Sequence, residues 1–307
     1  MPSGRFAPSP TGDLHLGNLR TAMVAWLFAR SDGATFVLRF EDLDTATVRP
    51  EYYQRQADDL AALGLDWDEP VIRQSDRLAI YHDVVDRLVA EGLAYPCYCS
   101  RREIREAAQA PNGPSTHEGY PQTCRHLSHA ERSARERSGR RAAYRLRTDE
   151  RSIRFDDLVA GPSEGPVDDL VIQRNDGTPA YNLVVVIDDV ASEIDVVVRA
   201  DDLLSSTPRQ LEVARVLGLP PPRYAHVPLV LSPSGDRLAK RDGAVTLADR
   251  GALGETPAQV RSFLASTLGL CEPDEPVTMA DLLARFDPAG LPTQPLVLDP
   301  DRPIVGL

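Results

Sequence analysis

The sequence predicts an α/β fold with a mainly parallel sheet and one inserted module. The chain has 307 residues, 42% of them hydrophobic, which is enough for one large α/β domain with insertions or for two compact domains. Predicted strands and helices alternate along the first part of the chain, as they do in βαβ units. From Pro96 to about Ser128 this pattern gives way to Cys, Pro, Gly and His residues without periodicity. We interpret that stretch as an insertion.

The first unit consists of a strand, a turn and a helix. Gly4 to Ser9 is predicted as a short strand that runs into the turn Pro8-Ser-Pro-Thr-Gly12, and Leu19 to Arg30 has the apolar spacing of a helix. The next strand, Ala34 to Phe40, ends in an acidic cluster formed by Glu41, Asp42 and Asp44. Two helices are predicted after it, at about Pro50 to Leu63 and Asp76 to Gly92.

Regular structure is predicted again after the insertion, and it leads into a mostly helical region. The predicted strands are Ala142 to Arg147, Leu170 to Arg174, Ile194 to Arg199 and Val227 to Leu231. Between them lie a turn at Asn175-Asp176-Gly177, a helix near Tyr181 and a helix over Pro208 to Leu217. A polar loop at 232–241 follows the last predicted strand.

The net charge of −12 argues against a protein that coats nucleic acid, because such proteins neutralise many phosphates with a basic surface. We therefore expect no DNA partner, and any RNA contact must be local. The basic residues concentrate in one stretch that contains Arg125, Arg132, Arg135, Arg137, Arg140, Arg141, Arg145, Arg147, Arg151 and Arg154. This stretch is either an RNA contact or a solvated helix and strand face.

The sequence also predicts a cytoplasmic location and no membrane partner. It contains no run of eighteen apolar residues. The opening residues MPSGRFAPSPTG lack the basic segment and apolar stretch of a secretory signal.

Three of the four cysteines, Cys97, Cys99 and Cys124, lie within the insertion. Zinc prefers four tetrahedral ligands, and a short module without its own core gains folding free energy from binding it. The candidates for a fourth ligand are Tyr120, His117 and His126. The alternative is a set of three buried, reduced thiols, which the Cys-x-Cys spacing makes the weaker interpretation.

His15-Leu16-Gly17-Asn18 stands where the first turn meets the first helix. A helix N-terminus offers unpaired N–H groups to phosphate, glycine admits a close approach, and imidazole can donate to a phosphate oxygen. By itself this tetrapeptide is weak evidence, since a histidine at a helix start is more often a cap.

A second motif lies in the loop Arg237-Leu-Ala-Lys-Arg241, which carries the only lysine among 34 basic residues. A compact ammonium at one position suggests a task that a planar guanidinium cannot perform. A lysine that reaches transferred phosphates would stabilise charge in the transition state. Random compositional drift is the alternative.

Together the two motifs resemble the signatures of class I aminoacyl-tRNA synthetases. Arg5-Phe-Ala-Pro-Ser-Pro-Thr-Gly-Asp-Leu-His-Leu-Gly17 is similar to the opening of glutamyl-tRNA synthetases, and Phe40-Glu-Asp-Leu-Asp44 and Ser206-Thr-Pro-Arg-Gln210 match the same family. The resemblance covers roughly residues 4 to 245. It implies a Rossmann-type catalytic domain with halves at 1–95 and 129–245, a zinc-binding insertion at 96–128 and a short helical C-terminal region at 246–307.

The resemblance also implies the roles of individual residues. It places Arg5, Ala7, Ser9, Glu41, Tyr181 and Arg199 in a glutamate pocket. The ATP site, used with Mg²⁺, is implied at His15, Gly17, Asn18, Arg237 and Lys240, of which His15, Asn18 and Lys240 act in catalysis. The implied ligands of one zinc ion are Cys97, Cys99, Tyr120 and Cys124. The chemistry agrees, because glutamate brings two carboxylates for Arg5 and Arg199 and one ammonium for Glu41.

Three positions depart from the family pattern. Asn18 stands where class I enzymes often have histidine, Arg237 replaces the usual lysine, and Ala200 replaces a glycine. The first two changes keep a hydrogen-bond donor or a positive charge, so we expect them to affect the rate more than the reaction type.

About 60 residues follow the Lys240 loop, whereas full glutamyl-tRNA synthetases carry a long anticodon-binding region there. The chain in this respect resembles the short glutamyl-queuosine tRNA(Asp) synthetases. That resemblance implies formation of glutamyl-adenylate from ATP and L-glutamate without tRNA, then transfer of glutamate to the queuosine base of tRNA(Asp). The alternatives are a truncated glutamyl-tRNA synthetase that charges the acceptor end and an inactive synthetase-like RNA-binding protein.

Overall fold

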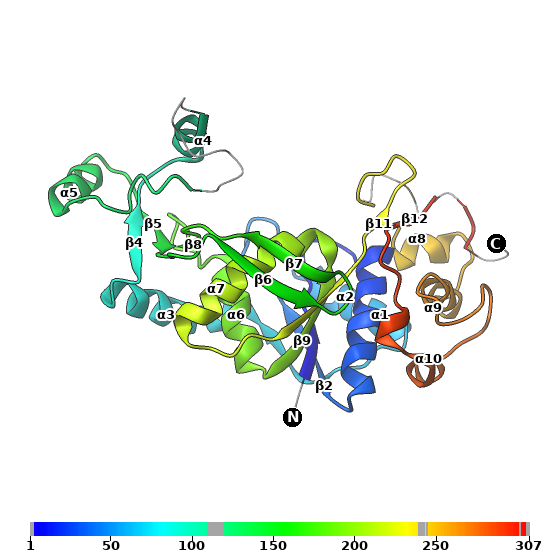
Figure 1. Cartoon of the computed structure of the whole chain (residues 1–307). Helices are drawn as coiled ribbons and strands as arrows, with labels where there is room; N and C mark the ends of the chain where they lie inside the picture. Colours follow the sequence, from blue (N-terminus) through cyan, green and yellow to red (C-terminus); the bar gives the residue numbers. More distant parts are fainter. Residues whose placement is uncertain (1–2, 110–119, 239–242, 244, 301, 305–307) are drawn as a thin grey trace.

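A seven-stranded sheet forms the centre of the protein in the computed structural model, which describes residues 3–109, 120–238, 243, 245–300 and 302–304 (Figure 1). Its order is β3-β2-β1-β9-β10-β6-β7, with all neighbours parallel except the antiparallel pair β6 and β7. The strands are β1 (Ser3–Phe6), β2 (Thr35–Phe40), β3 (Asp68–Arg73), β6 (Ser152–Asp157), β7 (Gly161–Pro166), β9 (Ile194–Ala200) and β10 (Arg223–Val227). The predicted α/β fold with a mainly parallel sheet is confirmed.

Two hydrophobic cores hold the helices in place. The larger core contains α1 (Leu16–Ser31), the end of α2 (Glu51–Ala62), α9 (Pro257–Ser266) and α10 (Met279–Arg285). The second core contains α3 (Leu78–Ala90), α6 (Tyr181–Ala191) and α7 (Thr207–Leu217). The short helix α8 (Leu247–Ala252) precedes α9.

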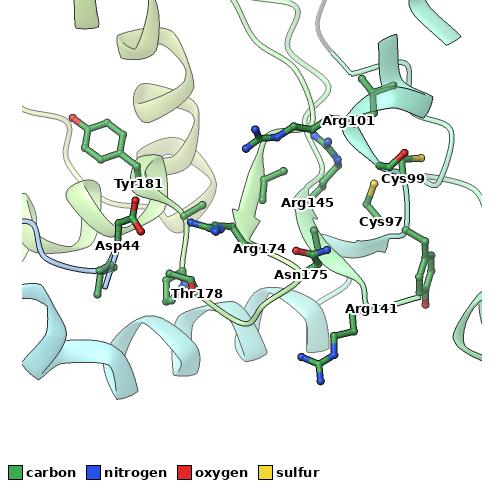
Figure 2. A pocket seen from close by; sticks show the side chains of 18 of the residues that line it. Asp44, Cys97, Cys99, Arg101, Arg141, Arg145, Arg174, Asn175, Thr178 and Tyr181 are labelled. Atoms are coloured by element: carbon green, nitrogen blue, oxygen red, sulfur yellow. The ribbon is translucent and has the colours of Figure 1, made fainter. Parts of the chain in front are cut away.

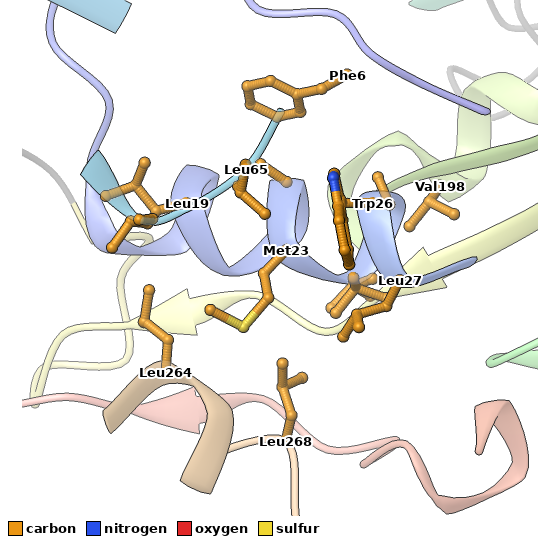
Figure 3. Close-up of a cluster of buried hydrophobic side chains, with 14 of the residues drawn as sticks. Phe6, Leu19, Met23, Trp26, Leu27, Leu65, Val198, Leu264 and Leu268 are labelled. Carbon is orange, nitrogen blue, oxygen red and sulfur yellow. The ribbon is translucent and has the colours of Figure 1, made fainter. Parts of the chain in front are cut away.

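Helix α1 is buried on nearly all sides because it lies between the sheet and the C-terminal helices. Figure 3 shows Met23 of α1 facing Leu264 and Leu268, while Val198 of β9 lies toward Trp26. A helix that is apolar all round is typical of such an enclosed position.

The one buried charged side chain of α1, Arg20, has hydrogen-bond partners. Arg20 donates to the carbonyl oxygen of Pro228 at 3.0 Å and to the hydroxyl of Thr267 at 3.1 Å. Helix α1 is thereby tied to the chain after β10 and to the C-terminal region.

The predicted helices and most predicted strands are present, but several observed strands, among them β3, β6 and β7, were not predicted, and one predicted strand was misplaced. The strand β3 contains Pro70, and β7 has the sequence GPSEGP; both lie at sheet edges, where a missing N–H is tolerated. The strand predicted at Val227 to Leu231 is wrong in its bounds. β10 ends at Val227, just before Pro228, and a short strand β11 (Val230–Leu231) pairs instead with β12 (Leu296–Val297).

The cysteine-bearing segment lies beside a separate antiparallel sheet at one end of the molecule (Figure 1). This small sheet has the order β4-β5-β8, and two helices accompany it. Its elements are β4 (Ala94–Cys97), α4 (Arg101–Gln109), α5 (His129–Arg137), β5 (Ala143–Leu146) and β8 (Val171–Gln173). The predicted turn after β8 is confirmed, with Gly177 at φ 92° and Arg174 N–H donating to Thr178 at 2.8 Å.

The sheet order creates a switch point between β1 and β9. From β1 the chain runs outward through β2 to β3, and β9 later pairs with the other side of β1. In doubly wound sheets, ligands bind in the crevice outside the carboxyl ends of the strands at such a point. None of the helices in the described part of the chain has the length and apolar character needed to cross a membrane.

Candidate active site

A cavity of about 710 Å³ opens at the carboxyl ends of β1 and β9. The residues predicted for ATP and glutamate that the structure describes all line it: Arg5, Ala7, Ser9, His15, Gly17, Asn18, Glu41, Tyr181, Arg199 and Arg237. They come from segments that are more than two hundred residues apart in the sequence, and the fold brings them together. Lys240 lies outside the described residues.

His15 is the N-cap of α1. Helix capping and the predicted phosphate contact are compatible, because they use different ring nitrogens. The imidazole Nδ1 accepts the Asn18 N–H at 3.2 Å, and the Asn18 side-chain oxygen accepts the His15 N–H at 3.2 Å. Burial, followed by the charge of Arg237, lowers the pKa of His15 to about 4, so the ring is neutral at pH 7. Because the cap uses the Nδ1 lone pair, the proton is on Nε2, which is then a donor available to an anionic ligand.

Gly17 leaves room for this cap. A Cβ atom at Gly17 would lie 3.0 Å from both Cε1 and Nδ1 of His15. Any larger residue would therefore push the imidazole away from its position at the start of α1.

A buried ionic network includes two of the cavity residues predicted to bind glutamate, Arg5 and Glu41. Asp189 of α6 accepts from Arg5 Nε at 3.2 Å and from Arg39 Nη1 at 2.7 Å, and Arg39 Nη2 lies 3.4 Å from Glu41. Arg5 also donates to the carbonyl oxygen of Val198 at 3.0 Å. Asp189 and Arg39, which the sequence did not single out, thus fix the two charged groups expected to meet the substrate. A signal for this network is present in the sequence, because Asp189 lies in an otherwise apolar helix. A buried carboxylate in such a helix needs a cationic partner.

Glu41 stands in an environment that disfavours its charge. Burial raises the pKa of Glu41, and the neighbouring cations Arg39 and Arg5 oppose that shift only in part. A carboxylate in this position gains when a cationic group such as an ammonium enters the cavity.

Arg237 also lines the cavity. Its guanidinium pairs with Asp202, which also lines the cavity. The side chain of Arg237 is 53% exposed. The guanidinium is therefore accessible from the solvent.

The three cysteines of the insertion converge. The sulfur atoms of Cys97, Cys99 and Cys124 lie within 4.8 Å of one another and could hold a metal ion. The hydroxyl oxygen of Tyr120 lies 3.2 Å from the Cys97 sulfur and 3.7 Å from that of Cys99. The guanidinium of Arg145 lies over the Tyr120 ring at 3.7 Å.

Of the two histidines considered as a fourth ligand, only one is described. His126 is exposed and does not join the cysteine group, and His117 lies outside the described residues. Among the described residues, Tyr120 is therefore the fourth-ligand candidate that lies at the cysteine cluster.

A second cavity of about 1140 Å³ runs from the first one toward the cysteine cluster. Ser9, Glu41 and Tyr181 line both cavities. Figure 2 shows Tyr181 at one end and Cys97 and Cys99 at the other. The exposed arginines along this groove are Arg101, Arg102, Arg140, Arg141 and Arg174. The two cavities thus form a continuous path with a basic wall.

The basic stretch noted in the sequence divides into two groups. Arg125 is engaged inside the protein, donating to Asp169 at 2.6 Å and to Asp149 at 2.8 Å. Arg140 and Arg141 line the groove. The stretch therefore supplies both structural ion pairs and part of the basic wall.

Comparison with known proteins places the chain in a family. The family description "tRNA synthetases class I (E and Q), catalytic domain" matches residues 3–282. A glutamyl-Q tRNA(Asp) synthetase of Nocardia farcinica is 57% identical over 96% of this chain and 93% of its own length. The protein of the same name from Symbiobacterium thermophilum is 47% identical over 96% of this chain and 95% of its own length.

Longer relatives match as well. A glutamate–tRNA ligase of a Synechococcus species is 41% identical over 92% of this chain, which spans 60% of that relative. The crystal structure of a glutamate tRNA ligase from Elizabethkingia meningosepticum in complex with its amino acid superposes with a TM-score of 0.83 at 27% identity, over 96% of this chain and 66% of that one. The chain therefore belongs to the class I tRNA synthetases of the glutamate and glutamine type, within the group of the glutamyl-Q tRNA(Asp) synthetases.

Proposed function

We propose that the protein activates L-glutamate with ATP, without tRNA, and transfers it to the queuosine base of tRNA(Asp). The convergence of the predicted ATP and glutamate residues on one cavity carries this proposal. The names of its relatives support the choice of acceptor.

In the first step, an oxygen of the glutamate α-carboxylate attacks the α-phosphorus of ATP. The new carboxyl–phosphorus bond forms as the bond to the β-phosphate oxygen breaks, which releases pyrophosphate and leaves glutamyl-adenylate. The neutral His15 donates from Nε2 to a phosphate oxygen, Arg237 and Lys240 neutralise developing charge, and Asn18 holds the His15 cap. Mg²⁺, bound with the ATP, would supply further charge neutralisation on the phosphates.

The glutamate half of the cavity supplies complementary charges. Arg5 and Arg199 face the two carboxylates of the amino acid, and Glu41 faces its ammonium. Ala7, Ser9 and Tyr181 complete the wall around the substrate.

The groove beside Tyr181 is the proposed path of the RNA. In the second step a hydroxyl of the queuosine cyclopentenediol attacks the adenylate carbonyl, so that an ester forms, AMP leaves and the hydroxyl proton is released. The exposed groove arginines are suited to phosphates of an anticodon loop, a local basic contact on an acidic protein. The inactive RNA-binding alternative is disfavoured because the charged groups of the cavity are all retained.

The acceptor is tested with ATP, labelled glutamate and separate tRNA species. We expect label on queuosine-containing tRNA(Asp), no label on the same tRNA without queuosine, and none on tRNA(Glu). Glutamate-dependent pyrophosphate exchange should proceed without any tRNA. Label only on the terminal adenosine of tRNA(Glu) would instead establish the truncated glutamyl-tRNA synthetase.

The cysteine cluster is proposed to hold one zinc ion through Cys97, Cys99, Cys124 and Tyr120. Three sulfurs and one phenolic oxygen at these separations fit the four tetrahedral ligands that zinc prefers, and the ion would stabilise the small module. Elemental analysis of protein purified without added metal should give about one zinc per chain.

Cysteine variants test the assignment. Cys99→Ser is expected to lower the zinc content strongly, and Cys271→Ser, a half-buried cysteine in another part of the chain, should leave it unchanged. If the wild-type protein carries no zinc, or if Cys99→Ser retains it, the cluster is a set of reduced thiols.

A further inference from the structure

The side chain of Arg199 is held by four contacts inside the protein. Its Nε donates to Nε2 of His226 at 3.0 Å and its Nη1 to Gln210 at 2.8 Å. Its Nη2 donates to the hydroxyl of Thr207 at 2.8 Å and to the carbonyl oxygen of Leu203 at 3.3 Å. Among the described residues these contacts use four of the five N–H groups of the guanidinium, and one Nη1–H is left for a ligand in the cavity.

Among these partners, His226 must have a defined protonation state. It lies on β10 directly beside Arg199 of β9 in the parallel register. An imidazole nitrogen can accept from the Arg199 Nε–H only if it carries no proton itself. The contact therefore requires a neutral ring with its proton on Nδ1.

Asp157 of β6 imposes that state. Its carboxylate lies 2.5 Å from Nδ1 of His226, and both side chains are fully buried. The same carboxylate accepts the backbone N–H groups of His226, Val159 and Ala160 at 3.0, 3.0 and 2.8 Å. The backbone donors hold the Asp157 carboxylate in place as an acceptor for the imidazole. The ring proton is therefore on Nδ1 of His226, and the lone pair is on Nε2.

The charges of the two groups agree with this arrangement. Burial raises the pKa of Asp157, but the hydrogen bonds from His226 and Ala160 outweigh it and hold that pKa below its usual range. Burial and the charge of Arg199 lower the pKa of His226, against the opposing effect of Asp157. A carboxylate next to a neutral imidazole is the combination that the Arg199 contact requires.

We infer that Asp157 and His226 are positioning residues that orient Arg199 for binding a carboxylate of the amino-acid substrate. This inference rests on the proposed function, because it needs glutamate as the ligand of the cavity. The chain of contacts runs from Asp157 on β6 through the buried ring of His226 on β10 to Arg199 at the cavity wall. Neither residue lines the cavity, so both act through Arg199.

Two substitutions of His226 separate positioning from packing. Asn places its amide near the Nδ1 position and keeps a donor for Asp157, whereas Gln extends to the Nε2 position and keeps an acceptor for Arg199. We expect His226→Asn to raise KM for glutamate about tenfold or more in pyrophosphate exchange, since a hydrogen bond to a charged group is lost. KM for ATP and kcat should stay within about twofold, and His226→Gln should recover most of the glutamate affinity.

A remote buried pair provides the matched control. Glu255 accepts two hydrogen bonds from Arg250 in the C-terminal region, and both side chains are buried. Glu255→Gln should lower Tm without a change in KM for glutamate. Asp157→Asn leaves the ring proton of His226 free to move to Nε2, so this variant should also raise KM for glutamate. It keeps the test decisive if His226→Asn does not fold.

The outcomes distinguish this inference from the proposed function. If the wild-type protein shows no glutamate-dependent exchange, the proposed function fails first. The inference is wrong if the wild-type protein is active and the folded His226→Asn and Asp157→Asn variants leave KM for glutamate unchanged. A lowered Tm alone, as expected for Glu255→Gln, would show that the Asp157–His226 pair is only structural.

Discussion

Replacing Lys240 by alanine is expected to lower glutamate-dependent pyrophosphate exchange about a hundredfold or more. A preorganised cation that meets charge developing on the transferred phosphates acts mainly in the transition state, so its loss lowers kcat. Affinity for glutamate should change little, because Arg5, Glu41 and Arg199 remain in place. Isotope exchange between pyrophosphate and ATP measures the effect.

Two further variants control this experiment. Lys240→Arg keeps the charge but replaces the compact ammonium, and we expect it to recover only part of the rate. Arg154→Ala removes a cation that is 83% exposed on the β6–β7 hairpin, and it should exchange at the wild-type rate. Near wild-type exchange in Lys240→Ala would remove this loop from the proposed catalytic site.

Replacing Glu41 by glutamine is expected to raise KM for glutamate about thirtyfold or more. Removal of one member of a buried charge pair costs on the order of 2 kcal/mol or more, because the substrate ammonium then loses its counterion. KM for ATP should stay unchanged. Glu164→Gln, which alters an exposed carboxylate paired with Arg154, is the matched control and should bind glutamate normally. An unchanged KM in Glu41→Gln would show that another group receives the ammonium.

The pH dependence gives a second test of Glu41. Because burial raises the pKa of Glu41, its carboxylate becomes protonated as the pH falls at values above the usual range of about 4 for glutamate side chains. Protonation removes the charge that pairs with the ammonium, so affinity for glutamate declines as the pH falls through the raised pKa of Glu41. The Glu41→Gln profile should lack this decline. Since both proteins see the same substrate titration, the difference between the two profiles isolates Glu41.

The sequence determined the parts of the fold that depend on local patterns. Helix α1, strand β2 and the turn at Asn175-Asp176-Gly177 follow from apolar spacing and turn residues close together in the chain. The edge strands β3 and β7 could not be predicted in this way. Their proline and glycine residues lower strand propensity, and only pairing with β2 and β6 makes them strands.

The sequence also determined the chemistry of the candidate site, since motifs with known spacing named residues that the structure brings to one cavity. It named His15 together with Asn18, but it named Arg199 without Asp157 and His226. His15 caps α1 by accepting the Asn18 N–H within one helical turn, and that contact is local enough to predict.

The support of Arg199 was decided only by tertiary structure. Asp157, Arg199 and His226 lie on three strands that are neighbours in the sheet but separated by long stretches of chain. Their contacts depend on strand order and on a register in which His226 faces Arg199. A shift of that register by one residue would turn the imidazole to the other face of the sheet. Strand register is a property of the packed sheet and its core, which is why a local reading of residues identified the arginine and missed the buried pair that holds it.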